Sequence, residues 1–296
     1  MIHSNYLARY FPFVAMTAAL LVASVAHGQL SSSLQLSKRQ FLMGESVMAT
    51  VTITNHAGRE LAFTSDGRNP WLNFLLKDGR GGLVMPRGKT VFGKMKIRPG
   101  ESLAREVDLT QHFRMNEAGN YSVGAVVNLP GDTGESSATN RMIFTLVPGI
   151  PYWSQKVGVP GKVGQTREFR VINYNGEDKA HLYAQVHDGR TGQNIRTFRL
   201  GDPLMLRKPL VTIDRQQRMH VMFLATPTMW VHCQVDTDGK LVNRQIHQRG
   251  PQGDPQLQTF GDGSVRVANS IPYDQKAAVT AKAKIRKASD RPAIAY

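Results

Sequence analysis

The sequence predicts an all-β protein, in which a β-sandwich is followed by an antiparallel β-meander. Apolar residues alternate with a period of two along many short segments, whereas the period of an amphipathic helix is nearly absent. Asp-Gly or Asn-Gly pairs lie between these segments, as is typical of hairpin turns. They begin at residues 66, 78, 175, 188, 238 and 262. With 296 residues, of which 41% are hydrophobic, the chain is long enough for two such units.

The N-terminal segment predicts export. Residues 1–9 carry Arg9 and no acidic side chain, and residues 10–26 are almost wholly apolar. Small residues then offer cleavage after Ala26 or after Gly28. We therefore interpret residues 1–28 as a signal peptide and expect a periplasmic or secreted protein, without a stable membrane span after cleavage. The alternative is an uncleaved anchor, because the apolar run approaches the roughly 17-residue lower limit of a span.

Residues 29–147 predict the sandwich. The clearest strand lies within residues 46–55, where Val47, Val51 and Ile53 fall on one face and threonines on the other. Seven short antiparallel strands in about 120 residues are typical of a β-sandwich. The other strands are expected at residues 33–38, 59–64, 71–77, 103–109, 120–128 and 140–147.

Four stretches of this unit resemble immunoglobulin-like domains of bacterial surface and periplasmic proteins. These stretches are QFLMGESVMATVTITN, PWLNFLLKDG, RPGESLAREVDL and NEAGNYSVGAVV. Residues 117–121 are similar to the tyrosine corner that opens the sixth strand, and Trp71 to the core tryptophan of the third. The resemblance covers residues 30–147. It concerns the architecture alone, because the cysteine pair of antibody domains is missing, and it implies spacing, docking or binding and no catalysis.

Residues 148–151 (Pro-Gly-Ile-Pro) predict a linker, because proline and glycine are poorly suited to continuing a strand. A faint hairpin repeat follows within residues 152–274. Residues 210–223 align with 257–268 and, less closely, with 170–184. Outer strand pairs are expected at 230–235 with 240–246 and at 182–187 with 194–200.

The middle unit, residues 210–247, is therefore predicted to form four consecutive antiparallel strands, and it resembles one blade of a β-propeller. A blade needs roughly 40–50 residues and a closed propeller at least about four blades. Residues 152–274 supply only two or three blades. We expect either an open meander or second sandwich, or a partial propeller that partner chains would close; the sequence leaves the oligomeric state open.

The charge of the chain predicts an anionic partner. The formal net charge is +15, and part of it lies in residues 275–296, which we interpret as a basic disordered tail. Outside the cytoplasm, such a surface is attracted to acidic polymers or to an acidic protein face. We therefore expect an anionic envelope polymer or a protein as the partner, and nucleic acid is not the expected one.

No catalytic or metal-binding signature is present in the sequence. The string VDTDGKLV (residues 235–242) fails as a calcium loop, because glycine comes at position 4 instead of 6 and His247 stands at position 12. We interpret it as a hairpin with a type I′ turn. The sequence has no Gly-x-Ser-x-Gly, Cys-x-x-Cys or His-x-x-x-His motif. Cys233 is the only cysteine, so no intrachain disulfide forms.

Aromatic and basic residues near turns are the candidate binding residues. An aromatic ring beside Arg or Asn in a loop suits carbohydrate or peptide binding, and burial of the rings in the core is the alternative. The candidates are Arg68, Trp71, Arg80, Trp153, Trp230, His181 and His220. We expect a non-enzymatic binding or assembly module of the cell envelope, without cofactor or metal. The alternative is a hydrolase or lyase of extracellular polysaccharide or peptide, with its site in residues 152–274.

Overall fold

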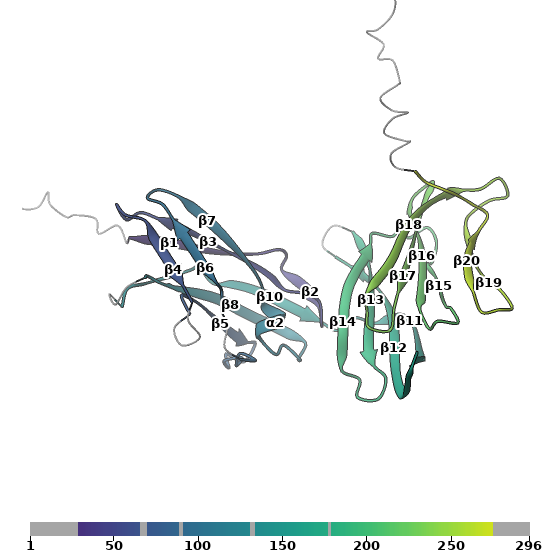
Figure 1. Ribbon diagram of the computed structural model, residues 1–296, viewed down its shortest axis with the longest axis horizontal. Helices are drawn as coiled ribbons and strands as arrows, with labels where there is room; N and C mark the ends of the chain where they lie inside the picture. Colours follow the sequence, from purple (N-terminus) through teal and green to yellow (C-terminus); the bar gives the residue numbers. More distant parts are fainter. Residues whose placement is uncertain (1–28, 66–69, 89–90, 131–133, 177–178, 275–296) are drawn as a thin grey trace, which may run out of the picture.

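The computed structural model describes residues 29–65, 70–88, 91–130, 134–176 and 179–274 (Figure 1). Strands make up nearly all of the regular structure, and almost every strand pair is antiparallel, which confirms the predicted all-β class. Within these residues, no helix is long and apolar enough to span a membrane. The predicted signal peptide and basic tail lie outside the described residues.

The first ten strands form two main sheets and one two-stranded sheet around one hydrophobic core. One sheet has the order β1-β3-β7 and the other β2-β10-β8-β5, with β9 pairing to β8 and a separate β4-β6 pair. Apolar residues of both sheets, among them Leu34, Val51, Leu76 and Phe144, share that core. The elements are β1 (Leu30–Leu36), β2 (Gln40–Leu42), β3 (Met48–Asn55), β4 (Leu61–Thr64), β5 (Leu72–Asp78), β6 (Lys94–Ile97), β7 (Ser102–Asp108), α2 (Leu109–His112), β8 (Gly119–Asn128), β9 (Ser136–Ala138) and β10 (Met142–Val147).

Two buried aromatic side chains of this core also donate hydrogen bonds to main-chain carbonyl oxygens. The Tyr121 hydroxyl donates a hydrogen bond to the Glu117 carbonyl oxygen at 2.8 Å, which closes the corner before β8. The buried Trp71 donates its indole N–H to the carbonyl oxygen of Gly93 at 3.0 Å and packs against Phe63. The Tyr121 hydroxyl and the Trp71 indole N–H therefore both have a hydrogen-bond partner, although their rings are buried.

The remaining strands form two larger sheets and a hairpin. Strands β11 to β14 pair in consecutive order, and so do β15 to β18, with β21 added at the edge of the second sheet. Pro151 begins β11, so the predicted linker is reduced to residues 148–150 between β10 and β11. The elements are β11 (Pro151–Val159), β12 (Lys162–Asn175), β13 (Ala180–Asp188), β14 (Asn194–Gly201), β15 (Leu210–Ile213), β16 (Met219–Thr226), β17 (Met229–Val235), β18 (Leu241–Arg249), β19 (Gln256–Thr259), β20 (Val265–Ala268) and β21 (Ser270–Pro272).

These sheets stack as layers, as Figure 1 shows. The two sheets enclose one core, to which Phe169 and Val186 contribute from the first and Phe223 and Cys233 from the second. The other face of the second sheet is covered by the β19–β20 hairpin, whose Leu257 and Val267 side chains pack against a second apolar cluster. That cluster consists of Met222, Leu224 and Trp230.

The hairpin turn at residues 236–239 has a geometry that differs from the predicted type. In the 236–239 turn, the Gly239 N–H donates to the Asp236 carbonyl oxygen and only Gly239 has a positive φ, of 76°. A type I′ turn needs positive φ at both central positions, so that prediction was wrong; the turn is a type I turn followed by a left-handed residue. The Asp236 carboxylate stabilises the turn by accepting the N–H groups of Asp238 and Lys240.

The first unit contacts the second through β2. Leu42 packs against Ile172 and Tyr183 on the outer face of the β11–β14 sheet. The Tyr183 hydroxyl donates to a Glu45 carboxylate oxygen at 3.0 Å, and Lys38 Nζ donates to both Glu45 and Tyr183. The interface therefore combines an apolar contact with a partly buried polar group of three side chains.

Candidate functional site

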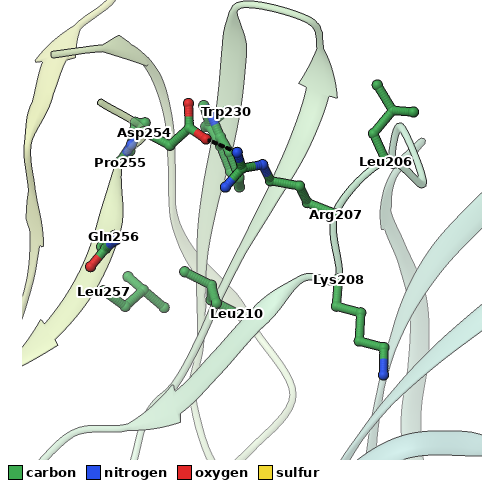
Figure 2. Close-up of a pocket in the computed structure, with 9 residues that line it drawn as sticks. All are labelled: Leu206, Arg207, Lys208, Leu210, Trp230, Asp254, Pro255, Gln256 and Leu257. Carbon is green, nitrogen blue, oxygen red and sulfur yellow. Dashed lines mark ion pairs between the residues drawn. The ribbon is translucent and has the colours of Figure 1, made fainter. Parts of the chain in front are cut away.

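A pocket lies between the second sheet and the hairpin that covers it. It has a volume of about 720 Å³ and is open to solvent on one side. Leu210, Trp230 and Leu257 supply apolar surface, and the polar residues come from the loops on either side (Figure 2). The complete lining is Leu206, Arg207, Lys208, Leu210, Trp230, Asp254, Pro255, Gln256 and Leu257.

One carboxylate in this pocket is shared by two guanidinium groups. Arg207 Nη2 lies 2.8 Å from Asp254 Oδ2, and this ion pair reaches from one wall of the pocket to the other (Figure 2). Arg249 contacts the other oxygen, Oδ1, at 2.6 Å. The Asp254 side chain is only 11% exposed, whereas both arginines are more than half exposed. The three side chains together carry one net positive charge, and the exposed Lys208 adds another.

A row of histidines lies beside the pocket on the same face of the second sheet. Side chains alternate between the two faces of a strand, so His220 shares a face with Met222, and His232 shares one with Trp230. His220 Nδ1 lies 3.0 Å from His232 Nε2, and the rings of His232 and His247 are 6.1 Å apart. All three residues are at most 5% exposed.

Hydrogen bonds connect this histidine row (His220, His232 and His247) at both ends. The Asp214 carboxylate lies 3.1 Å from His220 Nε2, and its second oxygen accepts backbone N–H groups of the turn that joins β15 to β16. At the other end, His247 Nδ1 lies 3.2 Å from the Ser270 hydroxyl. Among the described residues, His232 Nδ1 and His247 Nε2 have no hydrogen-bond partner.

Burial keeps the row uncharged at neutral pH. It lowers the pKa of His232 to about 3, with a further contribution from the two neighbouring imidazoles. Burial also lowers the pKa of His220, although the hydrogen bond to Asp214 opposes this effect, and it lowers the pKa of His247. An Asp-His-His chain is chemically suited to moving a proton, but here the three imidazoles are buried and almost without access to solvent.

The candidate binding residues predicted from the sequence lie in different parts of the structure. Trp230 is the one that lines the pocket, and its ring is 3% exposed. His220 belongs to the histidine row, whereas His181 is bonded to Asp202 at 2.8 Å on another sheet. The remaining candidates are Trp71 in the first core, Trp153 packed against the core between the two larger sheets, Arg80 on an exposed loop, and Arg68, which lies outside the described residues.

Most of the pocket residues were missed by sequence reasoning. Arg207 and Lys208 form a basic pair between Pro203 and Pro209, and this pair is the one local signal that marks a loop able to bind an anion. Asp254 and Leu257 carry no such signal, because they reach the pocket only through the return of the hairpin across the sheet. Among the residues that the structure describes, no group of three or more His, Cys, Asp or Glu is arranged to hold a metal ion.

Comparisons with known proteins add little to this geometry. No protein-family profile matches the chain, and no curated protein matches it. Among solved structures, the sporulation control protein Spo0M from Bacillus subtilis is similar over 86% of this chain and 94% of its own, with 10% identity and a TM-score of 0.27. A likeness at that TM-score supports no statement about fold or function.

Proposed function

We propose that this protein is an exported, non-enzymatic binding module that holds an anionic ligand in the pocket between β15 and β19. The observation that carries the proposal is the combination of an apolar floor with an excess of cationic side chains. Arg207 and Arg249 share the single Asp254 carboxylate, so a ligand carboxylate in the pocket gains a partially uncompensated guanidinium and the nearby Lys208. The apolar floor favours a ligand with an apolar face beside its charges.

Acidic polysaccharide is the ligand class that this surface suits best. Uronic acid residues combine a carboxylate with the apolar C–H face of a sugar ring, and the net charge of +15 attracts a polyanion over a longer range. Export is supported by the apolar N-terminal run that is followed by small residues. An acidic segment of a protein partner is the competing ligand class.

The architecture we propose for this module has two parts. The Tyr121–Glu117 hydrogen bond and the buried Trp71 support an immunoglobulin-like identity for residues 29–147. The consecutive strand order of β11–β14 and β15–β18, stacked face to face, supports propeller-like repeats for residues 152–274. In both cases, the sheets supply a rigid support and the loops between them supply the binding residues.

The proposal is tested by retention on immobilised polygalacturonate, with neutral dextran as the control matrix. We expect retention that is lost between about 50 mM and about 500 mM NaCl, because screening shortens the range of charge attraction below ~10 Å. The double variant Arg207→Gln/Lys208→Gln should weaken binding by roughly tenfold. The matched variant Lys162→Gln, at an exposed position on β12, keeps the pocket and should bind like the wild type.

Because all variants keep the basic residues 275–296, any difference in their retention reports on the pocket. Equal retention of all variants, or retention that does not change with salt, would contradict the proposal. Preferential retention of an acidic peptide over polygalacturonate would assign the pocket to a protein partner instead.

A further inference from the structure

The histidine row lies on the second of the two larger sheets (β15–β18), which packs against an extensive core on one face and against a small hairpin on the other. On one face of the second sheet, Phe223 and Cys233 belong to the extensive core shared with the first sheet. On the other face, the hairpin, with two strands of four residues each, packs against the Met222–Leu224–Trp230 cluster. In the strand register, His232 lies directly opposite Met222 and His247 directly opposite Trp230, so the row adjoins the cluster that the hairpin covers. The hairpin contributes few apolar contacts, with Leu257 and Val267 as its partly buried members.

Protonation of the row is therefore incompatible with a closed hairpin. A charged imidazole has two N–H donors, but His232 Nδ1 and His247 Nε2 have no acceptor within the described residues. Burying an unpaired charge is costly, and two charged rings 5–6 Å apart repel each other as well. Asp214 supplies one carboxylate, and that carboxylate can offset a charge on His220 alone.

The charged groups around the row do not relieve this conflict. From the β15–β16 turn, Arg218 already pairs with Asp214 at 2.8 Å. From β18, Arg249 pairs with Asp254 at the pocket, and Arg244 lies on the strand opposite Cys233 on the other face. The hairpin carries the exposed Asp262 and Arg266, and Arg266 lies over the Phe260 ring; β21 contributes the Ser270 hydroxyl.

We propose that the histidine row makes the β19–β20 hairpin an acid-released cover. Proton uptake by the row detaches the hairpin from the second sheet, while the core between the two larger sheets stays closed. Because Gln256 and Leu257 line the pocket from the hairpin side, release also removes one wall of the pocket. The opening does not depend on which ligand the pocket binds, so it stands or fails separately from the proposed function.

The test is amide hydrogen exchange of the intact protein between about pH 7.5 and about pH 4.5, corrected for intrinsic exchange. Each proton taken up on opening raises the opening constant by about tenfold for each pH unit below the ordinary histidine pKa of 6.5. We expect β19 and β20 to lose protection steeply on acidification, while β12 and β13 keep theirs. Hairpin protection that is independent of pH would overturn the proposal, as would an equal loss in both sheets.

A pair of variants assigns the effect to the row. His232→Gln removes one titrating group while keeping a polar partner for His220, so the slope for the hairpin should fall by about tenfold per pH unit. His187→Gln removes a half-buried histidine from the first sheet and should leave the slope unchanged. An unchanged slope in His232→Gln would overturn the assignment.

A second measurement avoids the risk that a variant misfolds. In the wild-type protein, NMR titration of the imidazoles should show the three histidines of the row gaining protons over the same pH interval in which the hairpin loses protection. If these imidazoles titrate while the hairpin amides stay protected, the proposal is wrong.

Discussion

Removal of one hydroxyl group tests how the two units are held together. Tyr183 is 1% exposed, and its hydroxyl donates to Glu45 and accepts from Lys38, both at 3.0 Å. Tyr183→Phe keeps the ring, and therefore keeps the contact with Leu42 and the position of the ring below the Lys38 ammonium group. The substitution isolates the polar part of the interface.

The expected loss in the free energy of unfolding depends on the hydrogen bonds that the Glu45 carboxylate keeps in the variant. A hydrogen bond to a charged group contributes about 1.5–3 kcal/mol. The Glu45 carboxylate keeps Lys38 at 2.7 Å and the backbone N–H of Leu42 at 3.0 Å, so it is not left unpaired. We therefore expect the free energy of unfolding to fall by an amount near the low end, about 1–2 kcal/mol.

Urea titration followed by circular dichroism measures this change. Because the hydrogen bond joins the two units, which have separate cores, the loss should appear in the transition of the unit that unfolds first. Tyr152→Phe is the control, because Tyr152 is 42% exposed and its hydroxyl makes no hydrogen bond within the described residues; it should shift stability by less than about 0.5 kcal/mol. If both variants match the wild type, the interface hydrogen bonds contribute nothing and the reasoning fails.

Three further predictions concern the pocket, the thiol and a turn. Asp254→Asn frees Arg207 and Arg249 and should strengthen salt-sensitive retention on polygalacturonate by a few-fold; weaker retention would mean that Asp254 is needed to position the arginines. Burial raises the pKa of Cys233 to about 11, so alkylation by iodoacetamide near pH 8 should be at least about a hundredfold slower than in urea, and comparable rates would contradict a closed core. Gly239→Ala should cost about 1–2 kcal/mol in thermal unfolding, because φ is +76° and a Cβ would lie 2.8 Å from Arg196 Cβ, whereas Gly58→Ala, in open space, should be neutral.

The strands that the sequence predicts well are those in which apolar and polar residues alternate over many positions. The buried and half-buried positions of β3 alternate over eight residues, and the predicted segment contains it. A strand of three or four residues gives few alternations and is recognised unreliably: β4 and β15 were predicted, whereas β2, β6 and β9 were missed. Strand β11 was missed because most of its side chains are exposed, and Gln155 interrupts the apolar alternation between Trp153 and Val157, which do face the core.

The candidate site was much less predictable than the strands. His220 and His232 are 12 residues apart, and they meet because β16 pairs with β17 in a register that places Met222 opposite His232. Such a register is set by packing on both faces of the sheet and is not written in a local motif. The pocket depends in addition on the return of residues 254–257 across the sheet, for which the sequence gives no local signal.

The contact between the units depends on main-chain atoms at residue 43. Gln185 and Thr197 both donate to the Met43 carbonyl oxygen, and Gly44 has a φ of +81° at a place where a Cβ would lie 2.5 Å from Asn194. A carbonyl group is the same whatever the side chain, so this contact places no demand on the side chain at position 43, which is held instead by its packing against the first core. Insertion or deletion of a single residue between β2 and β3 would move this carbonyl oxygen away from Gln185 and Thr197, and a side chain at Gly44 would collide with Asn194, so the joint between the units constrains the length and backbone of this corner.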